Sequence, residues 1–260
     1  MSESNKRNFI VHGSILAIAG ILVRIIGMLY RIPVVNIIGS EGNGIYGAAF
    51  NIYNIMLVLS SYGLPMAVSK LVSARFTKKR YKSAAKVLRC SLMVAVCTGG
   101  IAALLVFFGA SFIENVIYGG GLPGLAIPLR ILAPTIFLVA ILGVIRGFFQ
   151  GQSTMIPTAV SQILEQIVNA IVSIAAGYGM MKAFASSPDV AAYGAAGSTL
   201  GTAMGALTAV LFMGFLYAVY TPTFNRLKRK DRHTENQSTG QICKIIIYTC
   251  LLYTSPSPRD

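Results

Sequence analysis

Two arginines lie inside the first long apolar segment of the chain, residues 10–35. Arg24 and Arg31 are seven residues apart, nearly two turns of an α-helix, so they share one face about 10 Å apart along the axis. An arginine within the hydrocarbon core costs at least about 2.5 kcal/mol, so such residues usually face a protein-lined cavity. Guanidinium groups bind phosphate oxygens by charge-assisted hydrogen bonds. The spacing therefore predicts an anion-binding face, with snorkelling of either arginine to a lipid headgroup as the alternative.

A polar stripe runs along a second apolar segment, residues 156–180. Glu165 is the only acid well inside an expected span, and an intramembrane acid is a functional candidate with an arginine as its expected partner. The alternative is a purely structural ion pair between Glu165 and Arg24 or Arg31. The members of the stripe recur at spacings of three and four, and these are Ser161, Gln162, Glu165, Gln166, Asn169 and Ser173.

Two further amides, Asn51 and Asn54, are three residues apart and therefore share one face of the segment 45–62. We assign no catalytic residue and no cofactor or metal site, because the two histidines and four cysteines do not have the spacing of metal ligands. Coupling to an ion or to the membrane potential stays open, with no site assigned. We expect the substrate-binding residues to be Arg24, Arg31, Asn51, Asn54, Gln162, Glu165, Gln166 and Asn169.

The composition is that of an all-α, polytopic membrane protein. Of the 260 residues, 55% are hydrophobic and 12% charged, and the mean hydropathy is +0.68. The formal net charge of +14 does not indicate nucleic-acid binding, because the basic residues gather on alternate links between the apolar segments. By the positive-inside rule, this pattern predicts a cytoplasmic N-terminus.

Six membrane spans are expected, with an interfacial helix at 66–76 between the second and third. In the last span, Gly197, Gly201 and Gly205 form a ridge of small residues that predicts close helix packing. The expected spans cover residues 10–35, 45–62, 87–108, 126–148, 156–180 and 191–220.

Four regions follow from this pattern. Residues 1–220 form a six-helix transmembrane lobe, and residues 221–241 form a basic cytoplasmic linker that could bind anionic lipid headgroups. Residues 242–250 begin a seventh helix that is too short to cross a membrane. Residues 251–260 resemble a translated sequencing-adapter tail, so the chain is expected to be a fragment with a non-native end.

Several motifs resemble those of the polysaccharide-biosynthesis flippases of the multidrug/oligosaccharidyl-lipid/polysaccharide (MOP) exporter superfamily, and most closely their stage V sporulation protein B-like branch. The likeness extends to about Tyr220. The motifs are Arg24-Ile-Ile-Gly27-Met-Leu-Tyr-Arg31-Ile-Pro33, Gly42-x-Gly44-Ile-Tyr46-Gly47, Leu59-Ser-Ser-x-Gly63-Leu-Pro65-x-Ala-x-Ser69-Lys70, Arg146-Gly-Phe-Phe-Gln150-Gly-Gln152 and Gln162-x-x-Glu165-Gln166.

The resemblance implies two lobes of six helices around a central cavity, with alternating access, of which this chain supplies the first. It implies a flippase of the bacterial cytoplasmic membrane that moves an undecaprenyl-diphosphate-linked oligosaccharide, such as a peptidoglycan, cortex or polysaccharide precursor. By likeness to the related lipid II flippases, Arg24 and Arg31 would hold the diphosphate. The implied partners are this lipid-linked saccharide, membrane lipids and the missing C-terminal lobe.

Two other functions fit parts of the sequence. A cation-coupled multidrug exporter of the same superfamily could use Glu165 for cationic substrates, although Arg24 and Arg31 would repel them. A membrane enzyme acting on lipid-linked sugars would need a positioned acid or base, often with a metal. The expected spans hold one buried glutamate and no aspartate, and the one histidine, His12, lies at the interfacial start of the first span. We therefore expect a transporter rather than an enzyme.

Overall fold

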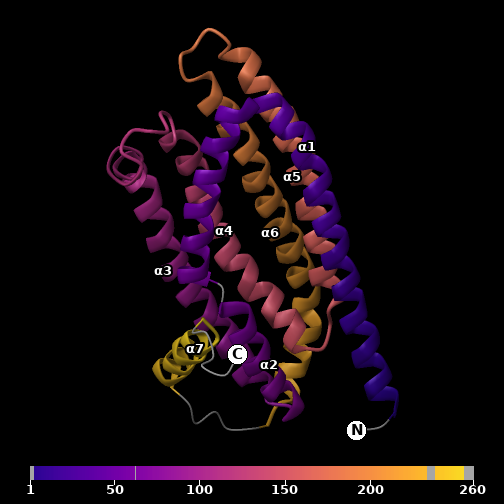
Figure 1. The fold of residues 1–260 in the computed structure, drawn as a ribbon. Coiled ribbons are helices and arrows are strands. Elements are labelled where there is room, and N and C mark those ends of the chain that lie inside the picture. Colours follow the sequence, from indigo (N-terminus) through magenta and orange to yellow (C-terminus); the bar gives the residue numbers. More distant parts are fainter. Residues whose placement is uncertain (1–2, 62, 233–237, 255–260) are drawn as a thin grey trace, which may run out of the picture.

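The computed structural model describes residues 3–61, 63–232 and 238–254, and these residues are almost entirely helical. Five helical stretches within this part of the chain are long and apolar enough to cross a membrane. Successive long helices run in opposite directions along one bundle axis (Figure 1), as expected for a polytopic all-α membrane protein. The helices are α1 (Glu3–Ser61), α2 (Leu64–Thr77), α3 (Tyr81–Phe112), the short π-helix η1 (Ile113–Ile117), α4 (Ala126–Gly151), α5 (Ile156–Ala183), α6 (Val190–Lys230) and α7 (Thr239–Thr254).

Helix α1 consists of two helices joined at Gly39, and these supply the first two expected spans. Gly39 has φ 72° and ψ −177°, a conformation that is open to glycine and strained for other residues. The chain climbs along a first arm (residues 3–38) and descends along a returning arm (residues 40–61), as Figure 1 shows. The sequence leaves residues 36–44 as a link between the expected spans 10–35 and 45–62, but helix resumes directly after Gly39.

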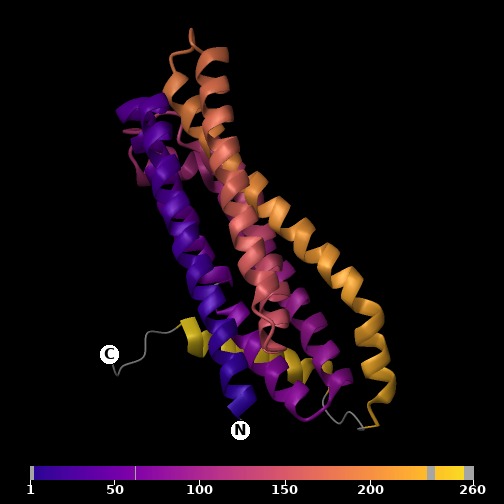
Figure 2. The same cartoon turned by 90° about the vertical axis from the view of Figure 1, so that its right-hand side faces the viewer.

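The glycine ridge of α6 packs directly against α5, which confirms the predicted close packing. A Cβ atom at Gly205 would lie 2.6 Å from the Glu165 carbonyl oxygen, and one at Gly201 would lie 2.5 Å from the Asn169 carbonyl oxygen. The two helices lie side by side along their upper halves in Figure 2, and α6 then diverges. The backbone of α5 along the polar stripe therefore packs so close to α6 that only glycine fits at Gly201 and Gly205.

An aromatic cluster explains why α6 continues to Lys230, ten residues beyond the expected end of its span. Phe224 is only 1% exposed, and its ring lies 5.4 Å from that of Phe148 and 6.1 Å from that of Phe76. Asp231 then accepts a hydrogen bond of 2.9 Å from the backbone N–H of Lys82, at the start of α3. Thr221–Lys230, expected to be linker, is thus helical and packed.

Helix α7 begins at Thr239, slightly before the expected start of the seventh helix, and buries Ile242 and Ile246. It continues through Thr254 and so includes the first four residues of the expected non-native tail. Residues 255–260 lie outside the described residues. With 16 residues, α7 is shorter than the roughly 20 needed to span a bilayer.

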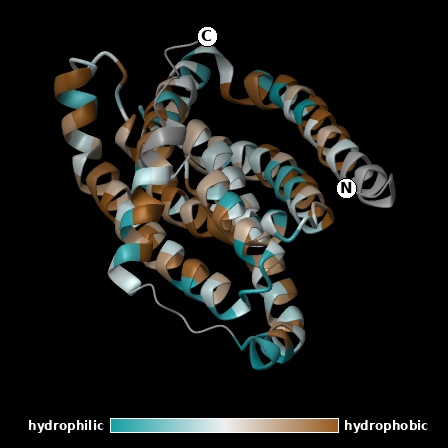
Figure 3. Ribbon diagram, turned by 90° about the horizontal axis from the view of Figure 1, so that it is seen from below, coloured by the Kyte–Doolittle hydropathy of each residue, from teal (hydrophilic) through white to brown (hydrophobic). Residues whose placement is uncertain are grey.

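Charged and apolar side chains are distributed as a membrane protein requires. Helix α2, the lower end of α6 and α7 lie at the bundle end where α1 begins (Figures 1 and 2), and this end carries the basic residues from Arg75 to Lys82. Viewed along the axis, hydrophobic ribbon runs along every long helix (Figure 3). Large apolar side chains such as Phe108 and Phe215 are exposed on the sides, at 76% and 65%.

Candidate functional site: the groove beside α1

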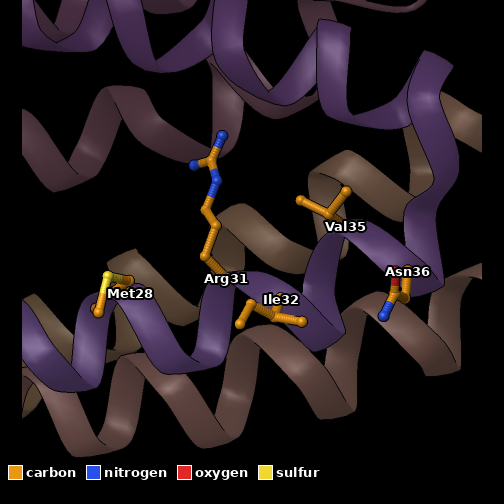
Figure 4. Close-up of a pocket in the computed structure, with 6 residues that line it drawn as sticks. Met28, Arg31, Ile32, Val35 and Asn36 are labelled. Carbon is orange, nitrogen blue, oxygen red and sulfur yellow. The ribbon is translucent and has the colours of Figure 1, made fainter.

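Arg31 is held in place by the returning arm of α1. Its Nη2 donates a hydrogen bond of 3.2 Å to Asn43 Oδ1, and its guanidinium carbon lies 4.6 Å from the centroid of the Tyr46 ring. Figure 4 shows the side chain extending from the first arm. It lines a pocket of about 490 Å³ together with Gly27, Met28, Ile32, Val35 and Asn36. Arg31 is therefore oriented by protein groups in the wall of this pocket. We call the pocket, together with the face of the first arm that carries Arg24 and Arg31, the groove beside α1.

Arg24 lies two turns below Arg31 on the same arm, is exposed, and does not line that pocket. The first arm runs parallel to α5 in a fixed register. A Cβ atom at Gly27 would lie 3.1 Å from Gln166 Nε2, and the Tyr30 hydroxyl meets Asn169. Both contacts join residues 139 apart, so the level of Arg24 corresponds to position 163 of α5, close to Glu165.

Asn169 joins three helices through one carboxamide. Its Nδ2 donates to the Tyr30 hydroxyl at 3.2 Å, and its Oδ1 accepts from Thr202 Oγ1 at 3.4 Å. Ser173 Oγ lies 2.9 Å from Asn169 Oδ1 and 2.8 Å from the Ser198 carbonyl oxygen, so its single proton serves either acceptor. Asn169 is 8% exposed. The centre of the polar stripe therefore links α1, α5 and α6 and is not open to a large ligand.

Glu165 pairs with an arginine, as expected, but this arginine is Arg146 and not the Arg24 or Arg31 of the alternative. Arg146 Nη2 lies 2.7 Å from Glu165 Oε2, and the two side chains are 14% and 27% exposed. Arg146 Nε also donates to Ser161 Oγ at 2.9 Å. Arg146, which falls near the end of the expected span 126–148, lies within α4 and faces α5. Its signal was a cation inside an apolar segment, one turn before Gln150.

The remaining predicted residues divide into two groups. Gln162 lines a second pocket of about 310 Å³ that also contains Arg146 and Gln150. Asn51 and Asn54 are exposed on the returning arm and line neither of these two pockets. The structure thus gathers the predicted residues of α5 around α1 and α4 and leaves the two asparagines of α1 outside.

Aromatic side chains on the returning arm connect Arg31 with the ion pair. The rings of Tyr46 and Phe50 lie 4.5 Å apart, and those of Phe50 and Tyr53 lie 5.7 Å apart. Tyr46 contacts Arg31, and Tyr53 is close enough to Glu165 to interact with it electrostatically. These tyrosines had no role in the sequence-based prediction, because their contacts depend on how the returning arm packs.

Known proteins match both the sequence and the fold. The sequence model of the family described as polysaccharide biosynthesis protein matches residues 10–252. The lipid II flippase MurJ of Bacillus subtilis (strain 168) is 34% identical over 176 residues, covering 65% of this chain and 32% of that protein. Stage V sporulation protein B of the same organism is 30% identical over 210 residues, covering 80% and 39%. The chain therefore spans less than half of the length of these relatives.

Solved transporters share the fold. A MATE transporter in complex with MaD3S superposes with a TM-score of 0.70 at 16% identity, over 92% of this chain and 52% of that one. A MOP superfamily transporter from Pyrococcus furiosus gives 0.67 at 18% identity, over 93% and 51%. The extent of the family match, together with these folds, confirms the resemblance found in the sequence. The chain belongs to the polysaccharide biosynthesis protein family and has the fold of part of a MOP-type transporter.

Proposed function

We propose that this protein is the N-terminal lobe of a flippase that moves an undecaprenyl-diphosphate-linked saccharide across the bacterial cytoplasmic membrane. The observation that carries the proposal is the pairing of Glu165 with Arg146 at 2.7 Å. Because this pair is neutral overall, Glu165, which lies near the level of Arg24, does not compensate Arg24 and Arg31. The groove beside α1 is therefore cationic, as a diphosphate requires.

The surroundings of Arg31 suit a lipid-linked anion. Its guanidinium is oriented by Asn43 and Tyr46 before a ligand arrives, which lowers the entropic cost of binding. Met28 and Ile32, which line the same pocket, are 66% and 60% exposed. An arginine next to an exposed apolar wall can hold a diphosphate while the polyprenyl chain remains in the bilayer.

The proposal includes an orientation and a second lobe. The basic end of the bundle, with α2 and the lower end of α6, would face the cytoplasm together with the N-terminus. The first six crossing segments would form one lobe, the segment between α6 and α7 would connect it onward, and a C-terminal lobe of the full-length protein would complete the cavity. The half-length match to MOP-type transporters supports this arrangement.

A cation-coupled multidrug exporter is the second candidate, which the fold of the similar MATE structures also fits, and Glu165 is the residue that favours it. A cationic drug would need that carboxylate, but Arg146 already neutralises it. A membrane enzyme acting on lipid-linked sugars has less support, because the named relatives include a flippase and the similar solved structures are transporters. We therefore favour transport of an anionic lipid-linked substrate.

Complementation tests this function. A full-length protein carrying this sequence is expressed in a bacterium depleted of its own lipid-linked-saccharide flippase. We expect Arg24→Ala and Arg31→Ala to fail to restore growth while reaching the membrane at normal levels. Arg130→Ala is the matched control, because Arg130 is an exposed arginine whose Nη2 binds Ser111 Oγ at 2.8 Å, away from the groove. Full activity of both α1 variants would contradict the proposal.

A further inference from the structure

The second pocket lies between α1, α2, α4 and α5, toward the bundle end where α1 begins. Its volume is about 310 Å³, near the lower limit of small-molecule sites, which span about 300–1,000 Å³. Its polar lining residues are Ser61, Arg146, Gln150, Thr158 and Gln162, and an apolar wall includes Leu57. The sequence singled out only Gln162 of this set as a substrate-binding residue.

The chemistry of the pocket favours a neutral ligand. Arg146 is its only charged lining residue, and Glu165 compensates it at 2.7 Å. The other polar groups are carboxamides and hydroxyls, which donate and accept hydrogen bonds, as sugar hydroxyl and acetamido groups do. Gln150 Nε2 lies 3.5 Å from Thr158 Oγ1, a weak contact that a ligand can replace. Gln162 has no hydrogen-bond partner within the described part of the chain.

The position of the pocket fits a substrate that is also held by the arginines of α1. In the parallel register of the first arm and α5, Arg24 lies at the level of position 163, next to that of Gln162. Arg31 lies at the level of position 170, about 12 Å higher along the axis than Gln162. The side chains of Tyr46, Phe50 and Tyr53 bridge these levels on the returning arm, and Leu57 and Ser61 continue the same helical face to the pocket.

We infer that this pocket is a saccharide subsite that binds the first neutral sugar of the substrate while the α1 arginines hold its diphosphate. The inference rests on the proposed function and adds a second recognition site to it. Gln150 and Gln162 bind the sugar through their carboxamides. Arg146 and Glu165 form a neutral pair in the pocket wall, so the pocket itself offers no uncompensated charge to a phosphate group.

Binding to a full-length protein that carries this sequence, reconstituted in lipid nanodiscs, tests the subsite with two probes, undecaprenyl diphosphate and undecaprenyl-diphosphate-linked N-acetylglucosamine. We expect the glycosylated probe to bind more tightly. Gln150→Ala and Gln162→Ala should each weaken only that probe, by about 3- to 10-fold. Gln152→Ala is the control, because this neighbouring glutamine binds the Phe148 carbonyl oxygen and does not line the pocket. Arg31→Ala should weaken both probes equally.

The outcomes separate the subsite from the function. If both probes bind equally to the unmodified chain and Arg31→Ala weakens both, the saccharide subsite is wrong and the diphosphate site stands. Glutamine variants that weaken both probes alike also overturn the subsite, because they then act on the fold or on the diphosphate. If neither probe binds more tightly than the nanodisc lipids, the proposed function and the subsite both fail.

Discussion

Arg146 Nη2 and Glu165 Oε2 lie 2.7 Å apart and join α4 to α5. The pair has two consequences for the groove. It removes the one intramembrane carboxylate that a cationic substrate could use, and it leaves the arginines of α1 as the uncompensated charges nearby. Ser161 supports the pair by accepting from Arg146 Nε at 2.9 Å. The identity of the partner of Glu165 therefore decides between an anion-binding and a cation-binding groove.

The ion pair should couple its two residues energetically. Exposed pairs contribute up to about 1 kcal/mol, whereas breaking a buried pair costs about 3–5 kcal/mol. With side chains 14% and 27% exposed, we expect Glu165→Gln to cost an intermediate amount, because Arg146 then stays half-buried without its counter-charge. The double variant Glu165→Gln with Arg146→Gln should be less destabilised than the sum of the single variants. Thermal unfolding in detergent measures the cycle, and additive effects would show that the pair is not coupled.

The close approach of α5 and α6 should depend on Gly201. A Cβ atom there would come within 2.6 Å of the Ser173 backbone nitrogen, and this clash should push the helices apart. We expect Gly201→Ala to destabilise the chain by about 1–3 kcal/mol. Gly214→Ala on the same helix is the control, since its Cβ would meet nothing within 4 Å. Equal melting temperatures for the two variants would contradict the close packing.

Asn169 should matter for stability, and Asn51 should not. Asn169→Ala removes the partner of Tyr30 and one acceptor of Ser173. A buried polar group without a partner costs about 1–3 kcal/mol, so we expect a loss of this size. Asn51→Ala is a matched control, because Asn51 is exposed on the returning arm. Thermal unfolding of both variants under the same conditions compares their stability. An Asn169→Ala protein as stable as the control would show that the hydrogen bonds of Asn169 do not stabilise the fold.

Glu114 should fix the start of α4. Its two carboxylate oxygens accept hydrogen bonds from the backbone N–H groups of Gly124 at 3.1 Å and Ala126 at 2.7 Å. Loss of an N-terminal cap costs about 0.5–2 kcal/mol. We expect Glu114→Ala to accelerate hydrogen exchange at these two amides about 5- to 30-fold. Glu41→Ala, an exposed acid at the same end, should leave them unchanged, and slow exchange in Glu114→Ala would disprove the cap.

Periodic patterns in the sequence predicted the elements of this fold well. The apolar segments, the interfacial helix at α2 and the glycine ridge on α6 all have spacings that one helix determines by itself. The end of α6 was placed too early because the charges after Tyr220 resemble a link, whereas burial of Phe224 by Phe76 and Phe148 keeps that stretch helical. A contact between distant segments outweighed the local composition.

Contacts between helices limited the prediction of the site. The stripe on α5 could be found because its members follow one another at helical spacing. The partner of Glu165 could not, since Arg146 is near in space only after α4 turns back into α5, and its charge resembled a positive-inside signal. Tyr30 reaches Asn169 across 139 positions of sequence. Both contacts, Arg146 with Glu165 and Tyr30 with Asn169, depend on which helices are neighbours, and a single sequence leaves this open.

The most direct test of the central claim compares an anionic and a cationic lipophilic ligand on one sample. The chain in nanodiscs is titrated with undecaprenyl diphosphate and, separately, with tetraphenylphosphonium. Our account predicts that the diphosphate binds, that Arg31→Ala weakens it about tenfold or more, and that the cation does not bind. Binding of tetraphenylphosphonium that Glu165→Gln abolishes, with no binding of the diphosphate, would contradict the account and identify a cation-binding groove.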